Sequence, residues 1–193
     1  MAEVMPINFP LPAEKAVVTY SYEDLVNGLG YSTFYCGVTD DGNYILTPFP
    51  FIASTRPGHQ YSDVENIKRT FVSSPFNTPR IMKGKALIKY GMSTSAAAGV
   101  RSMNLIIYKN TTALVTQAIT VPQASQGYYL TTEVTIPETN IAIGDVIKIE
   151  FDPTGAGDLY LAHDPSDEFD GTIGAFSTVH SSLKCEIPFK IDL

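Results

Sequence analysis

The sequence predicts an all-β protein, an antiparallel β-sandwich of jelly-roll-like design with one short N-terminal helical turn. The main observation is the segment 133–151, EVTIPETNIAIGDVIKIEF, in which two runs of alternating apolar and polar residues flank a break of Pro, Asn and Gly-Asp. A period of two lets one face of each run pack while the other meets water, as in antiparallel β-structure. Nothing in the segment repeats every 3.6 residues, and the same alternation recurs through most of the chain.

The first fifteen residues predict an extended arm. Pro6, Pro10 and Pro12 block both a helix and a central strand. Three apolar residues, Ile7, Phe9 and Leu11, alternate along the same stretch and need a surface to pack against. That surface is either this same domain or a neighbouring subunit. We therefore divide the chain into an arm at 1–15 and a single β-sandwich domain at 16–193.

The next stretch predicts a strand, a helical turn and a hairpin. Residues 16–22, AVVTYSY, have the composition of a strand. In the segment that follows, Ser21 can cap a single helical turn that Gly28 and Gly30 end. Residues 31–38 and 44–47 flank an Asp-Asp-Gly-Asn turn, which indicates a hairpin.

The rest of the chain predicts short strands separated by turns, which is typical of a sandwich or a barrel. Residues 48–79 read as long loops with one short strand at 69–73, and breaks are expected at 110–113 and 137–145, among other places. The remaining strands are expected at 86–90, 102–109, 114–121, 127–136, 146–152, 158–162 and 184–191.

Composition and charge exclude several classes of function. A chain of 193 residues with 44% hydrophobic and 17% charged residues is long enough to bury a core without a disulfide framework or a structural metal. The net charge of −7, with scattered basic residues, argues against nucleic-acid binding. No apolar run approaches the length of a membrane span, and the first residues do not read as an export signal.

The sequence offers few residues for catalysis. Its three histidines stand in no zinc-binding spacing, and the common signatures of hydrolases and of nucleotide-binding proteins are missing. We therefore expect no catalytic residues and no cofactor, and a protein that is not an enzyme.

Two groups of residues leave alternatives open. Asp164, Asp167 and Asp170 could converge in a loop as calcium ligands, although solvated acidic turns are the commoner outcome of such a pattern. Cys36 and Cys185 could form a disulfide if the first and last strands are neighbours, or could be buried as small apolar groups.

Two segments carry a resemblance to known proteins. SYEDLVNGLGYSTFYCGVTDDGNYILTPFPFIAS at 21–54 and SPFNTPRIMKGKALI at 74–88 resemble virion structural proteins of tailed phages and environmental viruses. In addition, the Gly-Asp step at 143–146 is similar to that of trimeric jelly rolls in head-decoration, fibre-head and C1q/TNF-like proteins.

The resemblance implies a function that composition and spacing do not show. It implies a non-enzymatic virion protein that is assembled in the host cytoplasm and exposed on the particle, as a capsid decoration, cement or head-fibre component. Its partners would be further copies of itself, as a homotrimer, and the major capsid protein or another virion protein. The alternative is a receptor-binding or glycan-binding module of a viral fibre or tail.

Overall fold

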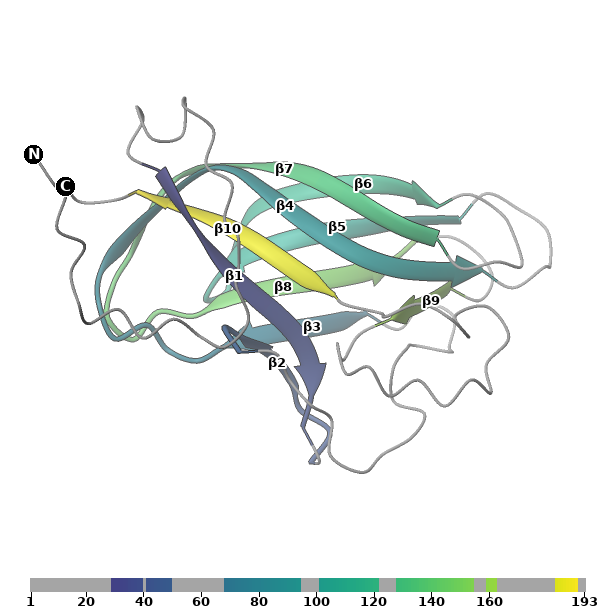
Figure 1. Ribbon diagram of the computed structural model, residues 1–193, viewed down its shortest axis with the longest axis horizontal. Coiled ribbons are helices and arrows are strands. Elements are labelled where there is room, and N and C mark those ends of the chain that lie inside the picture. Colours follow the sequence, from purple (N-terminus) through teal and green to yellow (C-terminus); the bar gives the residue numbers. More distant parts are fainter. Residues whose placement is uncertain are drawn as a thin grey trace, which may run out of the picture.

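The structure, a computed structural model, describes residues 29–39, 41–49, 68–94, 101–121, 128–154, 159–162 and 183–190. These residues form ten strands (Figure 1). The strands are β1 (Leu29–Val38), β2 (Tyr44–Thr47), β3 (Arg69–Ser73), β4 (Arg80–Thr94), β5 (Arg101–Lys109), β6 (Thr112–Val121), β7 (Tyr128–Ile141), β8 (Ile147–Pro153), β9 (Leu159–Ala162) and β10 (Lys184–Lys190).

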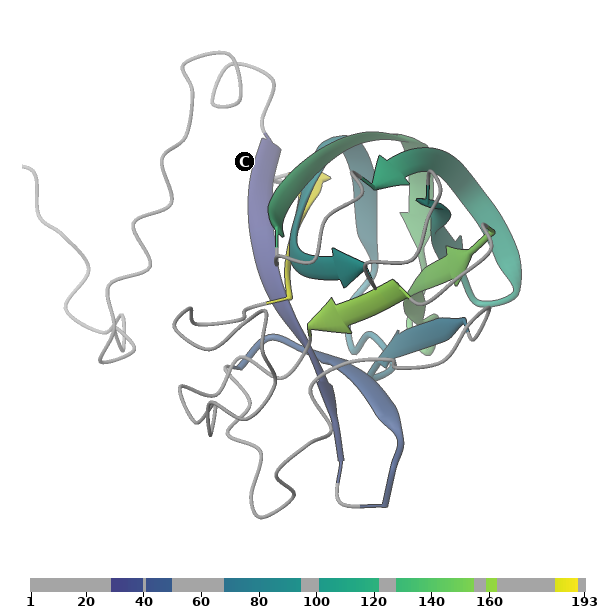
Figure 2. The ribbon, with the colours of Figure 1, turned by 90° about the vertical axis from the view of Figure 1, so that its right-hand side faces the viewer.

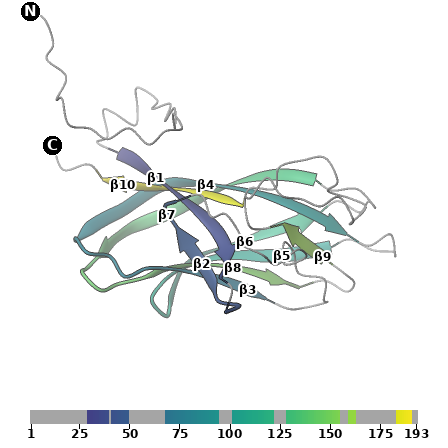
Figure 3. The same cartoon turned by 60° about the horizontal axis from the view of Figure 1, so that its bottom comes forward.

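The strands belong to one sheet that folds over on itself. Its order is β6-β5-β8-β3-β2-β1-β10-β4-β7, and β9 pairs with β4 beside this path. The two halves face each other as layers, with β10 and β4 in one layer and β8 and β3 in the other (Figure 3). Seen from its end, the sheet curls into a nearly closed ring (Figure 2). The end strands β6 and β7 approach each other there, although no ladder between them is formed by the described residues.

The interior is filled by the apolar residues of the alternating runs. Ile147, Ile149 and Phe151 of β8 point inward, and across the core the Phe151 ring meets the Tyr90 ring of β4 edge to face, with centroids 5.7 Å apart. Val134 and Ile136 of β7 are equally buried, as the alternation predicts. Burying these side chains supplies the main stabilisation of such a sandwich.

The predicted fold class is confirmed, with differences in detail. Strands β2 and β3 have the predicted bounds, and β1 and β2 pair antiparallel as the predicted hairpin. The β2–β3 pair is parallel, so the sheet is mixed. The strand expected at 16–22 and the helical turn up to Gly28 lie outside the described residues, whereas Gly30, expected to help end that turn, belongs to β1.

Two expected breaks are present but shorter than predicted. Strand β7 continues through Pro137 to Ile141, because among the described strands β7 ends the sheet and pairs with β4 alone, so this edge strand accommodates a residue without an amide donor. A shift in the β4–β7 register beside Gly84 absorbs the irregularity. The break expected at 110–113 is only the turn Asn110-Thr111, in which Asn110 has a positive φ of 53°.

Candidate functional site

A glutamate lies at the centre of the outer face formed by β3, β8 and β5. Glu150 alternates with inward-pointing residues of β8, yet it is only 7% exposed. Its carboxylate accepts hydrogen bonds from the hydroxyls of Thr70, at 2.8 Å, and Tyr108, at 3.0 Å. The ammonium of Lys68 lies 3.7 Å from the same carboxylate. Three strands therefore converge on one side chain.

Strand register explains why these residues meet. Thr70 of β3 and Ile106 of β5 stand directly opposite Glu150 on its two sides. Tyr108 is two residues beyond Ile106 on the same face and reaches Glu150 diagonally. We call Lys68, Thr70, Tyr108 and Glu150 the Glu150 cluster.

The electrostatics of the cluster keep Tyr108 a hydrogen-bond donor. Burial raises the pKa of the Tyr108 hydroxyl above its usual value of 10.0, and the hydrogen bond to Glu150, the charge of Glu150 and the charge of Asp152 raise it further. Both carboxylate oxygens of Glu150 are already bonded within the protein. The cluster thus links β3, β8 and β5 through one buried carboxylate, and the Lys68 side chain is its largely exposed member.

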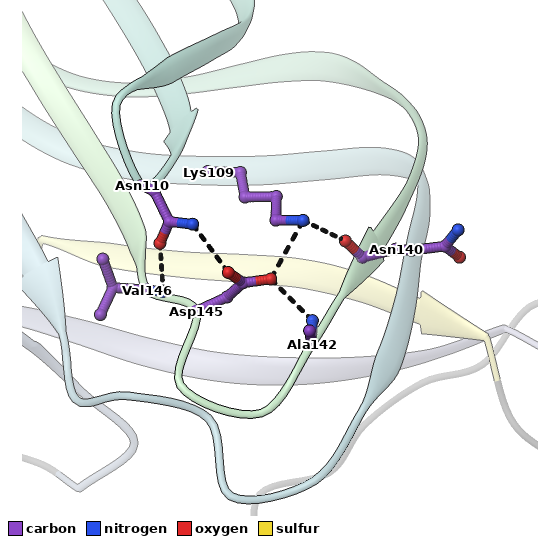
Figure 4. A network of polar contacts seen from close by, with 6 residues as sticks. All are labelled: Lys109, Asn110, Asn140, Ala142, Asp145 and Val146. Carbon is purple, nitrogen blue, oxygen red and sulfur yellow. Dashed lines mark hydrogen bonds and ion pairs between the residues drawn. The ribbon is translucent and has the colours of Figure 1, made fainter.

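A second polar network lies where the β7–β8 turn meets the β5–β6 turn (Figure 4). The Asp145 carboxylate accepts hydrogen bonds from the Asn110 amide and from the backbone N–H of Ala142, both at 2.7 Å, and pairs with the Lys109 ammonium at 3.0 Å. Asn110 in turn accepts a bond from the N–H of Val146 at 2.9 Å. Gly144, with φ at 88°, supplies the backbone bend that this arrangement needs.

These contacts stabilise the ionised form of Asp145. They lower the pKa of its carboxyl from 3.8 to about 2; the hydrogen bond from Asn110 contributes most, followed by those from Ala142 and Lys109. Asp145, from the Gly-Asp step noted in the sequence, therefore links the β7–β8 turn to the β5–β6 turn.

The residues proposed from the sequence as sites lie outside the described part of the chain. This holds for the calcium candidates Asp164, Asp167 and Asp170 and for the arm residues Ile7, Phe9 and Leu11. Among the described residues, no group of three or more His, Cys, Asp or Glu side chains could hold a metal ion. No helix in the described ranges has the length and apolar character that crossing a membrane requires.

The two cysteines lie close together on neighbouring strands. Strand β1 pairs with β10, and the sulfur atoms of Cys36 and Cys185 are 3.8 Å apart, a thiol contact rather than a disulfide bond. Both side chains are fully buried, so they fill the core as small apolar groups.

Sequence reasoning missed the Glu150 cluster. Lys148 and Glu150 alternate with apolar residues and read as an ordinary solvent face. Only the register of β8 with β3 and β5 brings Thr70 and Tyr108 onto Glu150, and that register joins residues far apart in the sequence. The sequence itself showed only Tyr108 in one alternating run and Glu150 in another, with nothing to indicate that the two side chains meet.

No protein-family model matches the sequence, and no curated protein matches it. Among solved structures, an aminopeptidase from a marine sediment archaeon, Thaumarchaeota archaeon, is similar with a TM-score of 0.55 at 10% identity, over 84% of this chain and 37% of that chain. A CocE/NonD family hydrolase from Staphylococcus aureus gives a TM-score of 0.53 at 9% identity, over 84% of this chain and 37% of that one. The chain thus spans little more than a third of these hydrolase chains, and at such identities the likeness shows the fold alone.

A third match comes from a structure of infectious bursal disease virus, Gt strain. It has a TM-score of 0.37 at 12% identity and covers 96% of this chain and 40% of that chain. A likeness of this size carries no argument about function.

The comparisons correct one expectation. Because the sequence shows few catalytic motifs, we expected a protein that is not an enzyme, but the two solved chains described above with TM-scores of 0.55 and 0.53 are hydrolases. This β-fold occurs as a part of enzymes, so missing sequence motifs are no ground for excluding the chain from them.

Proposed function

We propose that the chain is a β-sandwich module that works through its surface, by binding and assembly, and that it serves as a structural protein exposed on a virion. The observation that carries the proposal is the distribution of apolar and polar side chains among the described residues. The space between the layers is filled by buried apolar side chains, and the two polar clusters lie on the outside. What the module presents to other molecules is its outer faces, its turns and its sheet edges.

The assignment to a virion depends on the resemblance of the segments 21–54 and 74–88. In the structure, residues of the second segment pack against β10. Phe76 packs against Phe189 of β10, with ring centroids 5.9 Å apart, and the Arg80 guanidinium lies over both rings, 5.9 and 5.5 Å from their centroids. Decoration, cement or head-fibre protein is the role that this resemblance favours, with further copies of the chain and a capsid protein as partners.

A second candidate is a binding part of a larger hydrolase. It is favoured by the two matches with TM-scores of 0.55 and 0.53, which cover 84% of this chain but 37% of each hydrolase chain. In that setting the sandwich would hold a substrate or a neighbouring domain while another part of the polypeptide performs the reaction.

One experiment separates the two candidates. An antibody raised against the purified chain is used to probe virus particles and soluble cell fractions from the source, and the bands are identified by mass spectrometry. The virion role predicts a band in purified particles whose peptides match this chain, in fixed ratio to the major capsid protein. A larger polypeptide that is confined to the soluble fraction and contains hydrolase peptides would contradict it and support the second candidate.

A further inference from the structure

We propose that Cys36 and Cys185 form a redox-dependent cross-link, a disulfide that joins β1 to β10 when the chain folds in the presence of a low-molecular-weight disulfide. The structure shows the reduced form, in which the two sulfur atoms are 3.8 Å apart. The inference goes beyond the proposed function and applies equally to a virion protein and to a part of a hydrolase. It gives a chemical reaction to two side chains that otherwise only fill the core.

The register of β1 with β10 brings the two cysteines together. Cys185 stands opposite Phe34, and the backbone N–H of Cys36 donates a hydrogen bond to the carbonyl of Leu183 at 3.0 Å. Because side chains alternate along a strand, Phe34 and Cys36 both point to the inner face, where Cys36 is the diagonal neighbour of Cys185. A disulfide bond is about 2.0 Å long, so the sulfur atoms have to approach each other by about 1.8 Å. Side-chain rotation with a small adjustment of the two strands covers this distance.

The cross-link would act on the strand that holds one layer together. Strand β10 lies between β1 and β4; its ladder with β1 is continuous over seven residue pairs, whereas its ladder with β4 shifts register between Glu186 and Phe189. Among the described strands, the other neighbour of β1 is the four-residue β2. A covalent bond between β1 and β10 therefore keeps β10 in place, and with it the connection of β1 to β4.

The separation of the two cysteines along the chain makes the cross-link effective. They are 149 positions apart, in the first and the last described strands. A cross-link restricts the unfolded chain, and the loss of unfolded-state entropy grows with the length of the loop that it closes. A bond between β1 and β10 thus stabilises the fold more than a bond between strands that follow each other in sequence, such as β5 and β6.

Burial determines when the bond can form. The exposed fraction of both cysteine side chains is 0%, so an oxidant reaches neither sulfur atom while the sandwich is closed. Before β10 enters the sheet, the Cys185 thiol lies outside the core and can react. We therefore expect the cross-link to be made while the chain folds, or when β10 opens locally.

The reaction is a thiol–disulfide exchange in two steps, written here with oxidised glutathione. The Cys185 thiol loses its proton to solvent and attacks one sulfur atom of glutathione disulfide, whose S–S bond breaks; one glutathione leaves as a thiolate and takes up a proton. As β10 pairs with β1, the Cys36 thiol loses its proton and attacks the Cys185 sulfur atom, and the second glutathione leaves in the same way. One disulfide is reduced to two thiols, and two protein thiols become one disulfide.

The first test refolds the unfolded, reduced wild-type chain in a buffer of reduced and oxidised glutathione. Remaining thiols are then alkylated with N-ethylmaleimide in denaturant, and the products are identified by mass spectrometry. We expect a chain that is lighter by two hydrogen atoms, carries no alkyl group and yields a peptide in which Cys36 is joined to Cys185. The control Cys185→Ala keeps one thiol and should carry one alkyl group or one glutathione. A wild-type chain that carries two alkyl groups or two glutathiones would overturn the proposal.

The second test compares melting temperatures of the wild-type chain refolded with reductant and with the glutathione mixture. The cross-linked form should melt at least about 5 °C higher, whereas C185A should melt at the same temperature in both buffers. The two wild-type measurements decide the question even if C185A fails to fold. Equal melting temperatures, or a lower value for the oxidised wild type, would show that the cysteines serve only as small core residues and would overturn the proposal.

The third test adds oxidised glutathione to the folded, reduced chain. Cross-linking should then be at least about 100-fold slower than during refolding, and urea below the unfolding transition should accelerate it. Equal rates in the folded and the refolding chain would overturn the inference that the entry of β10 governs the reaction. None of these results bears on whether the chain is present in purified particles or belongs to a hydrolase, so failure of the cross-link is distinguishable from failure of the proposed function.

Discussion

Replacing Glu150 by Gln should destabilise the fold more than replacing any exposed glutamate of the other layer. The change keeps the size of the side chain but removes the negative charge of the carboxylate, which accepts hydrogen bonds from the hydroxyls of Thr70 and Tyr108. A hydrogen bond to a charged group contributes about 1.5–3 kcal/mol and a neutral one about 1 kcal/mol, so two bonds lose about 2 kcal/mol. The partial exposure of Tyr108 lowers this figure to about 1–2 kcal/mol, and the ion pair with the exposed Lys68 adds little.

The chain offers a matched control for this variant. Glu133 on β7 pairs with Lys85 at 2.8 Å, but its side chain is 51% exposed and that of Lys85 is 63% exposed. A surface pair of this kind contributes at most about 0.5 kcal/mol, so Glu133→Gln should be nearly silent.

Urea denaturation followed by circular dichroism measures both variants against the wild type. We expect E150Q to lower the midpoint clearly, with an unchanged slope, and E133Q to leave it close to the wild-type value. If the two variants agree within about 0.5 kcal/mol, the hydrogen bonds to Glu150 are exchanged for water without loss and the reasoning is refuted.

Two further predictions concern the Asp145 network and the cysteines. Because the pKa of Asp145 is lowered from 3.8 to about 2 in the folded state, its contribution to stability is present above pH 3.8 and is lost as the pH falls toward 2. Unfolding free energies measured between pH 5 and pH 2 should therefore fall more steeply for the wild type than for Asp145→Asn. Parallel curves would show that the pKa of Asp145 is the same in the folded and unfolded states and would contradict the prediction. Cys185→Ser should cost about 1–3 kcal/mol, since it buries a hydroxyl among apolar side chains, whereas Cys185→Ala should cost less, and a serine variant as stable as the alanine variant in urea would contradict full burial.

The parts of the fold that follow local rules could be predicted from the sequence. The short strand 69–73 is confirmed, and the two-residue period of a strand places Phe71 and Ser73 on the same, buried face. Pro137 misled the prediction, since whether a proline ends a strand depends on whether that strand lies at an edge, and edge position follows from the whole sheet. The burial of Glu150 was missed for the same reason. It depends on the register of β8 with β3 and β5, which are distant in the sequence, and the residue pattern of β8 alone does not reveal that register.

The place of β10 in the sheet has a consequence for how the protein is made. This strand is synthesised after every other described strand, yet it lies between β1 and β4 and pairs with both. Until it leaves the ribosome, the layer that contains β1 and β4 is divided, with two open edges and exposed apolar surface. The sandwich is therefore complete only after β10 has left the ribosome, and a chain cut short before residue 184 would lack an inner strand and be prone to aggregation or degradation.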